Sequence, residues 1–290
     1  MIYGKRKVHI LFIDNRNSKL NSFIILLNSK GHYLEMKLYD CISTGFERGL
    51  LQVVLNSNTL ANILLERTDK QGGAKKAGSI GRKLTSAMKA LSDFTAFKDW
   101  IMEQVEKDLP DSDGYNDDNR EDEYLKRRHS FLLSTAAYCV ASFVLGLGDR
   151  HNDNLMMTRN GHFFHIDFGH ILGNFKSKMG IKRERALMVF THAMKETIGD
   201  EDYEEFVSLS CTIFNILREN ATLLVSLLSL AVPMNLPELQ REKDVMWIYE
   251  KLQVDLTEEE AAEYFRKQLN AALHIRGTRI NDMFHMLAHA

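Results

Sequence analysis

The stretch Gly146-Leu-Gly-Asp-Arg-His-Asn-Asp-Asn154, followed by Phe164-His-Ile-Asp-Phe-Gly-His170, decides how the rest of this sequence is interpreted. Six polar residues stand together from Asp149 to Asn154, and an apolar run lies directly on either side of them. Burying an unpaired carboxylate is costly, so acidic and amide groups placed beside a core usually face a ligand, a metal or each other.

The second cluster has the period of a β-strand. From Phe163 to Phe168 the alternation puts His165 and Asp167 on one face and apolar residues on the other. The pattern therefore predicts that Asp167 is displayed at the end of a strand.

The composition is that of a globular protein able to bury a large core. The 290 residues are 44% hydrophobic, which suits one large domain or two lobes. The net charge of -2 shows no basic excess, so we expect no nucleic-acid partner. Three scattered cysteines are too few for a disulfide framework or a zinc site, which favours a reducing, cytoplasmic location. The sequence has no signal-peptide pattern, and Ala221–Met234, its nearest approach to a membrane span, is interpreted as a buried core helix.

Hydrophobic periodicity predicts strands near the start of the chain and helices afterwards. Val8–Ile13 and Gly49–Leu55 are rich in strand-forming residues, whereas Leu20–Leu27 fits either a helix or a strand, and we favour the helix. Helices are predicted over Asn56–Asn62, Asp93–Leu109, Arg127–Leu147, Glu201–Leu217, Ala221–Leu230, Glu242–Leu252, Glu258–Ala272 and Arg279–His289. Thr257 and Glu260 have the spacing of a capping box that opens one of these helices.

Two polar segments are predicted to be irregular. Thr68–Lys83 is rich in Gly and Lys but has no P-loop spacing, so we interpret it as a surface loop rather than a phosphate-binding loop. Pro110–Glu123 is acidic and is interpreted as a solvated linker.

The order of the motifs resembles the catalytic domain of phosphoinositide 3-kinases, class I in particular. The segments Gly148–Asn154, His165–Lys178 and Gly180–Arg185 resemble the catalytic and activation loops of that family. Further similar segments are Tyr39–Gly45, Gln52–Asn56, Tyr138–Ser142 and Pro237–Leu239. The resemblance implies an α+β, protein-kinase-like bilobal fold. It places a partial, strand-containing N-lobe at 1–55, which ends at the hinge, and a mainly helical C-lobe at 56–290.

Phosphoryl transfer from ATP requires metal ions with hard oxygen ligands, and the attacking hydroxyl needs a positioned proton acceptor. By resemblance, Asn154 and Asp167 match the ligands of Mg2+ or Mn2+. Asp149 and His151 are the candidate bases, one or both of them, with His151 as the first choice. Arg150 is expected to pair with a buried acid rather than to touch the substrate.

Other residues are assigned to adenine by the resemblance. The hinge corresponds to Gln52, Val53 and Val54, the floor of the pocket to Met156 and Ile166, and the tyrosine behind it to Tyr39. The apolar members of this set would serve equally well as ordinary core. His165 and His170 do not have the spacing of a zinc motif, so we expect them to be structural.

A basic cluster follows the Asp-Phe-Gly motif and consists of Lys176, Lys178, Lys182, Arg183 and Arg185. Such a run can be plain surface, but arginine and lysine also bind phosphate strongly where water is partly excluded. Its position favours a lipid headgroup. The resemblance implies transfer to the 3-hydroxyl of phosphatidylinositol 4,5-bisphosphate by a transferase associated peripherally with a membrane, and a regulatory subunit that binds through upstream domains.

The sequence also departs from the family pattern. Ile13 stands where the resemblance implies a lysine that contacts the ATP phosphates, and the phosphate-covering loop has no counterpart, so we expect the domain to be N-terminally incomplete. Two functions therefore stay open: a phosphoinositide 3-kinase, or an inactive or weakly active pseudokinase-like binding module.

Overall fold

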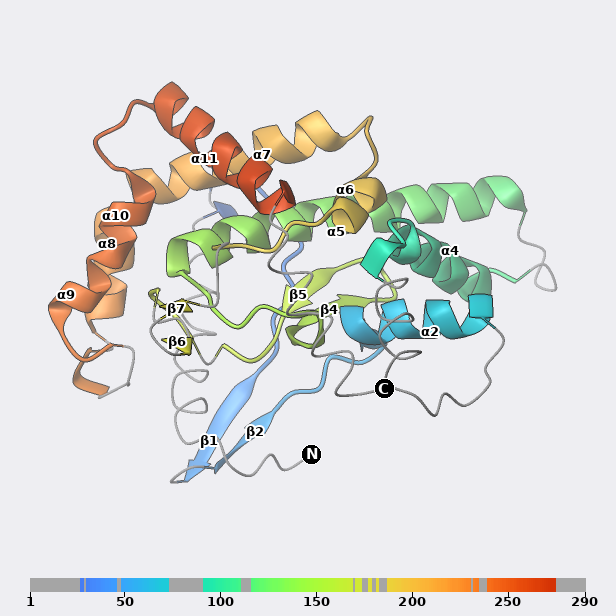
Figure 1. The fold of residues 1–290 in the computed structure, drawn as a ribbon, viewed down its shortest axis with the longest axis horizontal. Helices are drawn as coiled ribbons and strands as arrows, with labels where there is room; N and C mark the ends of the chain where they lie inside the picture. The colour runs from blue at the N-terminus through green and yellow to red at the C-terminus, as the bar shows by residue number, and fades with distance from the viewer. Residues whose placement is uncertain are drawn as a thin grey trace.

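The computed structural model describes residues 27–28, 30–45, 48–72, 91–110, 116–168, 170–173, 177–178, 181–182, 187–230, 232–234 and 239–274. In these parts of the chain helices dominate, and the strands form three small antiparallel sheets (Figure 1). The predicted α+β class is confirmed.

The central element is the long helix α5 (Asp117–Leu145), which is contacted by most of the other layers. Figure 1 shows α7 and α11 on one side of it and the sheet that contains β4 and β5 on the other. Nearly all residues of its second half are buried, as the apolar pattern predicted. The elements that contact it include α4 (Ala96–Asp108), α6 (His192–Ile198), α7 (Tyr203–Glu219), α10 (Trp247–Leu252) and β5 (Phe163–His165).

Local signals fix both ends of α5. The side chain of Asn116 accepts from the amide of Asn119, and the side chain of Asn119 accepts from the amide of Asn116. Acidic residues in the first turn favour the positive end of the helix dipole. The prediction of a linker through Glu123 was therefore wrong from Asp117 onward. At the other end Gly146 adopts a left-handed conformation with φ 56°, as expected of a C-cap glycine.

A three-stranded sheet lies beside α5 and has the order β3 (Ser57–Thr59), β4 (Leu155–Thr158), β5. The predicted helix at Asn56–Asn62 was wrong in its first half, because 57–59 pair with β4 and the helix α2 (Leu60–Gly72) begins only afterwards. The same helix extends through residues 68–72, which were predicted to be a loop.

The C-terminal helices agree with the predicted ranges to within a few residues, although α9 (Glu242–Val245) and α10 replace one predicted helix. The capping box of α11 (Glu258–His274) is confirmed, because Thr257 N donates to Glu260 Oε2 at 2.9 Å and Glu260 N donates to Thr257 Oγ1 at 3.3 Å. Helix α6 was not predicted. Short 3-10 turns occur at Asn152–Asn154 (η2) and Val232–Met234 (η3).

Helix α8 (Ala221–Ser229) corrects another expectation. Only Ala221 and Leu228 are buried in it, because it lies at the edge of the helical layer, so the prediction of a core helix was wrong. Within the described ranges no single helix is long and apolar enough to cross a membrane; α7 and α8, bent by 65°, pass that test only as a pair.

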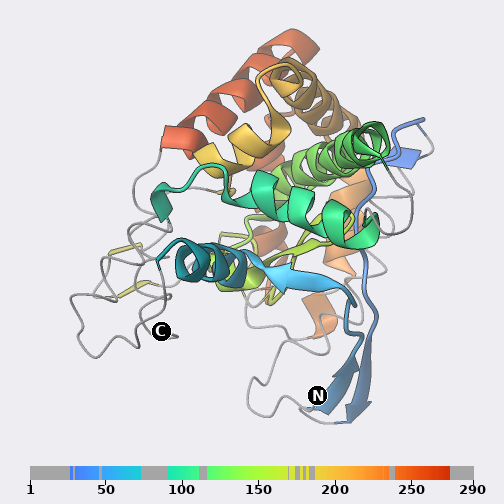
Figure 2. The same ribbon diagram turned by 90° about the vertical axis from the view of Figure 1, so that its right-hand side faces the viewer.

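A two-stranded ribbon of β1 (Cys41–Gly45) and β2 (Arg48–Leu51) extends away from the helices (Figure 2). The strand predicted over Gly49–Leu55 therefore ends at Leu51. The predicted elements at Val8–Ile13 and Arg279–His289, and most of Leu20–Leu27, lie outside the described residues. The lobe boundary between 55 and 56 stays a prediction.

Candidate active site

The β4–β5 hairpin brings the two polar clusters of the sequence together. Leu155 pairs with His165, and one position further on Ile166 N donates to Asn154 O at 3.0 Å. Asn154 therefore lies opposite Ile166 and beside Asp167. The two residues predicted to bind a metal are neighbours in space, although 12 residues separate them in the sequence.

The amide of Asn154 is oriented by the polar loop that precedes it. Asn154 Nδ2 donates to Asp149 O at 2.9 Å and lies 3.2 Å from His151 Nε2. Asn154 is buried, with only 7% of its surface exposed. An amide nitrogen has two hydrogens, and these two acceptors use both. The carbonyl oxygen Oδ1 is consequently the group that Asn154 can offer to a cation.

The same contacts assign the tautomer of His151. Its Nε2 accepts from Asn154, so the proton of the neutral ring is on Nδ1, which lies 3.6 Å from Asp153 Oδ2. His151 is buried, and Asp149, the other predicted base, is half-buried. The structure thus turns the imidazole of His151 toward the proposed metal ligand.

Both acidic residues of the predicted site have an uncommon backbone conformation. Asp149 has φ 58° and Asp167 has φ 53°, in the left-handed region that non-glycine residues rarely occupy. Strand β5 ends at His165, so the alternation that the sequence predicted does not continue to Asp167. Such strain is typical of functional sites, where the surroundings hold the backbone in place.

Arg150 connects the two clusters. Its Nε donates to Gly148 O at 2.8 Å, its Nη1 donates to Ile166 O at 2.6 Å, and its Nη2 donates to Asp167 O. Its guanidinium also lies over the Phe168 ring, 5.7 Å from the centroid. The sequence predicted a buried acid as a partner of Arg150, and this stays a prediction; the three acceptors given above are main-chain carbonyl oxygens. Periodicity gives no signal for such acceptors, so this role was missed.

The structural role predicted for His165 is confirmed. Its ring is 1% exposed, stacks on Tyr138 with 4.7 Å between centroids, and places Nδ1 3.4 Å from Ser142 Oγ. Burial, assisted by the positive charge of Arg150, holds the pKa of His165 well below its ordinary value. The imidazole is therefore neutral and belongs to the core. His170 contributes its main-chain oxygen, which accepts from Gly148 N at 2.9 Å.

The residues predicted to form the adenine floor share one face of the sheet. Met156 pairs with Phe164, so Ile166, two positions further along, lies diagonally beside Met156 on the same face. Both side chains are half-buried. Tyr39 is buried next to Phe164, the residue of this face that pairs with Met156: its hydroxyl donates to His165 O at 3.2 Å, and its ring is 6.3 Å from that of Phe164.

The predicted hinge residues are held to the strands on both sides of them. Gln52 N donates to Asp40 O at 2.7 Å, and Gln52 Oε1 accepts from Asp40 N at 2.8 Å. Val53 is 64% exposed and Val54 is half-buried. The carbonyl of Val54 accepts from Ser57 Oγ at 2.7 Å, which leads the chain directly into β3 and so to the edge of the floor strand β4.

Comparisons with known proteins cover most of the chain. Residues 19–241 match the profile of a family described as phosphatidylinositol 3- and 4-kinase. The chain belongs to this family. Its kinase-like fold agrees with the α+β architecture described above.

Three relatives illustrate how similar this chain is to known proteins. Phosphatidylinositol 3-kinase 1 of Dictyostelium discoideum is 39% identical over 268 residues, 91% of this chain and 15% of that protein. The phosphatidylinositol 3-kinase C2 domain-containing subunit gamma of Homo sapiens is 33% identical over 264 residues, 89% of this chain and 16% of that protein. The phosphatidylinositol 4-phosphate 3-kinase C2 domain-containing subunit beta of Homo sapiens is 33% identical over 286 residues, 95% of this chain and 16% of that protein. The chain thus spans only 15–16% of the length of these relatives.

The residues at the site fit a family member that uses a divalent metal. Among the described residues no group of three or more His, Cys, Asp or Glu side chains could hold a metal ion. The donors present are instead the Asn154 amide oxygen and the Asp167 carboxylate. Hard oxygens of this kind suit Mg2+, which usually keeps several waters and takes its remaining ligands from the phosphates of its substrate.

The predicted headgroup residues are only partly covered by the structure. Lys178 ends β6 (Ser177–Lys178) and Lys182 ends β7 (Ile181–Lys182), and these strands pair so that Ser177 lies opposite Lys182. The side chains of both lysines, and all of Lys176, Arg183 and Arg185, lie outside the described residues. Their assignment stays a prediction.

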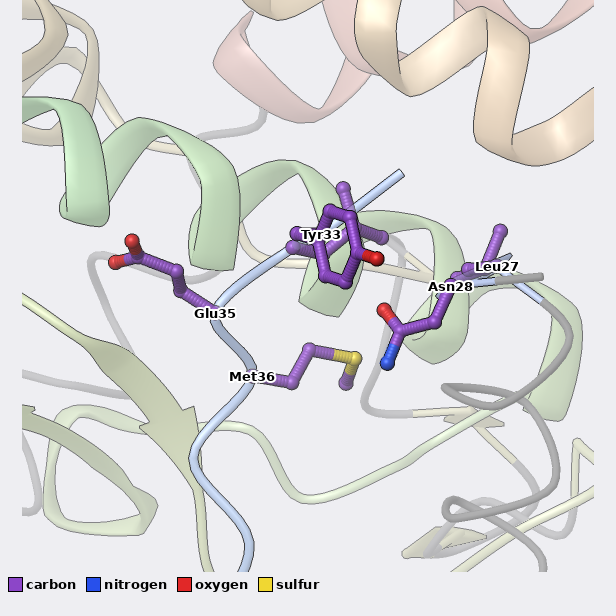
Figure 3. A pocket seen from close by; sticks show the side chains of 6 residues that line it. Leu27, Asn28, Tyr33, Glu35 and Met36 are labelled. Atoms are coloured by element: carbon purple, nitrogen blue, oxygen red, sulfur yellow. The ribbon is translucent and has the colours of Figure 1, made fainter. Parts of the chain in front are cut away.

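A cavity of about 260 Å3 lies elsewhere, against the segment 27–36. It is lined by Leu27, Asn28, Tyr33, Leu34, Glu35 and Met36, none of which was predicted to belong to the site. Figure 3 shows Asn28 and Met36 turned toward each other and Glu35 turned away. The cavity is smaller than most ligand pockets, which exceed roughly 300 Å3.

Proposed function

We propose that this chain is the catalytic domain of a lipid kinase that transfers the γ-phosphate of ATP to the 3-hydroxyl of an inositol phospholipid. The observation that carries the proposal is the hydrogen bond from Ile166 N to Asn154 O, which brings the backbone of Asn154 close to that of Asp167. Membership of the phosphatidylinositol 3- and 4-kinase family supports the same activity.

In this proposal Asn154 Oδ1 and the Asp167 carboxylate hold the metal. A divalent metal held by these two residues would supply positive charge that offsets the charge developing on the phosphates. Met156 and Ile166 form the floor for the adenine, Tyr39, beside Phe164, closes the back of the pocket, and the main chain of Gln52, Val53 and Val54 binds the edge of the base. Because the base is recognised by main-chain groups, Gln52 can replace the acid that is usual there.

The 3-hydroxyl oxygen attacks the γ-phosphorus, the bond from that phosphorus to the β–γ bridging oxygen breaks, and the hydroxyl proton passes to a protein base. Asp149 and His151 are both proposed for this step. His151 Nε2 accepts the amide of Asn154, so this nitrogen becomes available only if the amide turns away. Comparing Asp149→Asn with His151→Gln separates the two, because only the variant that lacks the base loses the rising limb of the pH–rate profile.

The basic cluster supports a phosphorylated headgroup as substrate. Our proposal is phosphatidylinositol 4,5-bisphosphate, and phosphatidylinositol 4-phosphate is a second substrate to test because one relative is named for it. The enzyme would act in the cytoplasm at a membrane surface, where its substrate lies, and a regulatory subunit would bind through further domains.

The experiment uses radiolabelled ATP with vesicles that contain phosphatidylinositol, its 4-phosphate or its 4,5-bisphosphate. Label at the 3-position of the phosphorylated lipids is expected, and product no greater than that of an Asp167→Ala control refutes the proposal. Replacing Lys182 and Arg183 by alanine should reduce turnover of the bisphosphorylated lipid more than that of phosphatidylinositol. Equal loss on both lipids refutes the headgroup assignment.

A pseudokinase-like module is the alternative, and the presence of Ile13 in place of the implied lysine favours it. Residue 13 lies outside the described residues, so only its identity enters the argument. Loss of one phosphate contact can reduce phosphoryl transfer by orders of magnitude, because catalysis here is positioning plus electrostatics. Saturable nucleotide binding without lipid product would identify this alternative.

A further inference from the structure

We infer that Trp247 on α10 is a positioning residue that clamps the start of the polar loop to the segment that follows Asp167. The inference rests on the proposed function, which gives both segments their roles. Trp247 was not singled out by the sequence.

The two segments form a short ladder of main-chain hydrogen bonds. Leu172 N donates to Leu145 O at 2.8 Å, Gly173 N donates to Gly146 O at 3.3 Å, and Gly148 N donates to His170 O at 2.9 Å. Residues 145–148 lead into the polar loop, and residues 170–173 lead from Asp167 toward the basic cluster. The ladder therefore sets the position of one functional segment relative to the other.

The indole ring of Trp247 covers a glycine on each side of this ladder. A β-carbon on Gly146 would lie 2.8 Å from Trp247 Cε2 and Cζ2, and one on Gly173 would lie 2.3 Å from Cζ3 and 2.6 Å from Cη2. Both glycines have positive φ, 56° and 70°. The benzo ring thus rests directly on two backbones, at positions where any larger residue would displace it.

The ring itself is fixed by the helix that carries it. Ile248 and Leu252, on the same helix, are fully buried at 0% exposure, and α10 packs against α5 and α8. Lys251 Nζ lies over the indole, 4.4 Å from the ring centroid. Figure 1 shows α10 near the end of α5 from which the polar loop departs. The packing of α10 therefore holds the indole ring of Trp247 against the ladder.

Removing the ring should loosen residues 170–173 while leaving Asn154, which is held by the polar loop and the hairpin, in place. Residues 170–173, which lead toward the basic cluster, are therefore the part whose backbone should become more mobile. We therefore expect Trp247→Ala to lower kcat for lipid phosphorylation on the order of tenfold or more, and to raise KM for lipid. The KM for ATP should stay within about twofold, because the three hydrogen bonds of the ladder involve none of the residues proposed to bind adenine. Trp247→Tyr, which keeps an aromatic ring, should restore most of the activity.

Trp100 supplies the matched control, since it is the other tryptophan of the chain and lies 9% exposed on α4. Trp100→Ala should lower the melting temperature without a selective change in lipid kinetics. Gly173→Ala completes a double-mutant cycle with Trp247→Ala. The backbone strain at φ 70° is present in both backgrounds and cancels, so the cycle isolates the contact between ring and glycine. We expect Gly173→Ala to reduce kcat less when Trp247 is already alanine.

Amide hydrogen exchange tests the clamp independently of enzymatic activity. In Trp247→Ala the amides of Gly148, Leu172 and Gly173 should lose protection, while those of α11 stay protected. If exchange at these three amides is unchanged, or if Trp247→Ala and Trp100→Ala alter lipid kinetics alike, the inference is overturned. If the wild-type chain makes no lipid product but Trp247→Ala exposes the three amides, the clamp stands and the proposed function fails.

Discussion

Replacing Arg150 tests whether one side chain holds the two polar clusters in register. Arg150 is only 8% exposed, and its guanidinium donates to the carbonyls of Gly148, Ile166 and Asp167. Arg150→Ala leaves these acceptors without their donor and removes the cation from the Phe168 ring. We expect both lower stability and a displaced Asp167.

The magnitude follows from the number and type of bonds. A hydrogen bond to a charged group contributes roughly 1.5–3 kcal/mol, so three would sum to about 4.5–9 kcal/mol if they were additive. Water can reach part of this site because Asp167 is half-buried, so we expect Arg150→Ala to lower the free energy of unfolding by about 3–4 kcal/mol. Arg150→Lys should lose about 2 kcal/mol, because an ammonium group cannot span three carbonyls as the planar fork does.

Urea denaturation followed by circular dichroism measures the free energies, and lipid phosphorylation measures the effect on Asp167. Turnover in both variants should fall by more than the loss of folded protein accounts for. The pKa of His165 should rise in Arg150→Ala without returning to its ordinary value, since burial is the larger of its two causes. Unfolding free energies within about 0.5 kcal/mol of the wild type for both variants would refute the reasoning.

Three further predictions concern single positions. Gly161→Ala should lower the free energy of unfolding, measured by denaturant melts, by at least about 3 kcal/mol, because its β-carbon would lie 2.0 Å from Arg127 O. Gly31→Ala is the control: Gly31 has a similar φ but nothing within 4 Å of the added β-carbon, so the loss should be only about 1 kcal/mol. Equal losses for the two variants would contradict this reasoning. Because the folded pKa of His165 lies well below 6.5, the unfolded state binds the extra proton, so the free energy of unfolding should fall as the pH drops below 6.5, by up to about 1.4 kcal/mol per pH unit for this group. A His165→Phe variant should lack this part of the slope, and an unchanged slope would show that other groups produce it. Asn154→Asp keeps an oxygen ligand but can no longer donate to Asp149 O, so kcat for lipid should fall on the order of a hundredfold; wild-type kcat would remove Asn154 from its proposed role.

The sequence predicted the helices well where one physical signal dominated. α11, which carries both a capping box and an amphipathic pattern, was placed to within two residues at each end. The half of α5 that is apolar nearly all round was predicted as a helix, whereas its first ten residues were missed. Errors arose where polar residues had structural roles. Asp117 begins a helix inside a segment whose acidity resembled a linker, because acidic side chains favour a helix N-terminus.

The sequence named the residues of the candidate site, which stay a prediction, but it could not give their geometry. The resemblance selected Asn154 and Asp167, and the hairpin brings the backbone of Asn154 opposite Ile166, the residue before Asp167. No periodic signal could show that Arg150 donates to carbonyl oxygens, because main-chain acceptors leave no trace in a sequence. The contact of Trp247 with two glycines was hidden for the same reason: it joins residues about 75–100 positions apart, and each looks ordinary by itself.

The two strained aspartates explain why the site needs such contacts. A non-glycine residue in a sparsely populated backbone region costs of order 1–3 kcal/mol, and Asp149 and Asp167 both adopt one. Arg150 bonds to Gly148 O, directly before Asp149, and to Asp167 O, so one guanidinium opposes relaxation at both positions. The Trp247 ring packs against the flanking glycines Gly146 and Gly173. A site fixed in this way before any substrate arrives spends less binding energy on ordering itself, and electrostatic catalysis of phosphoryl transfer depends on that preorganisation.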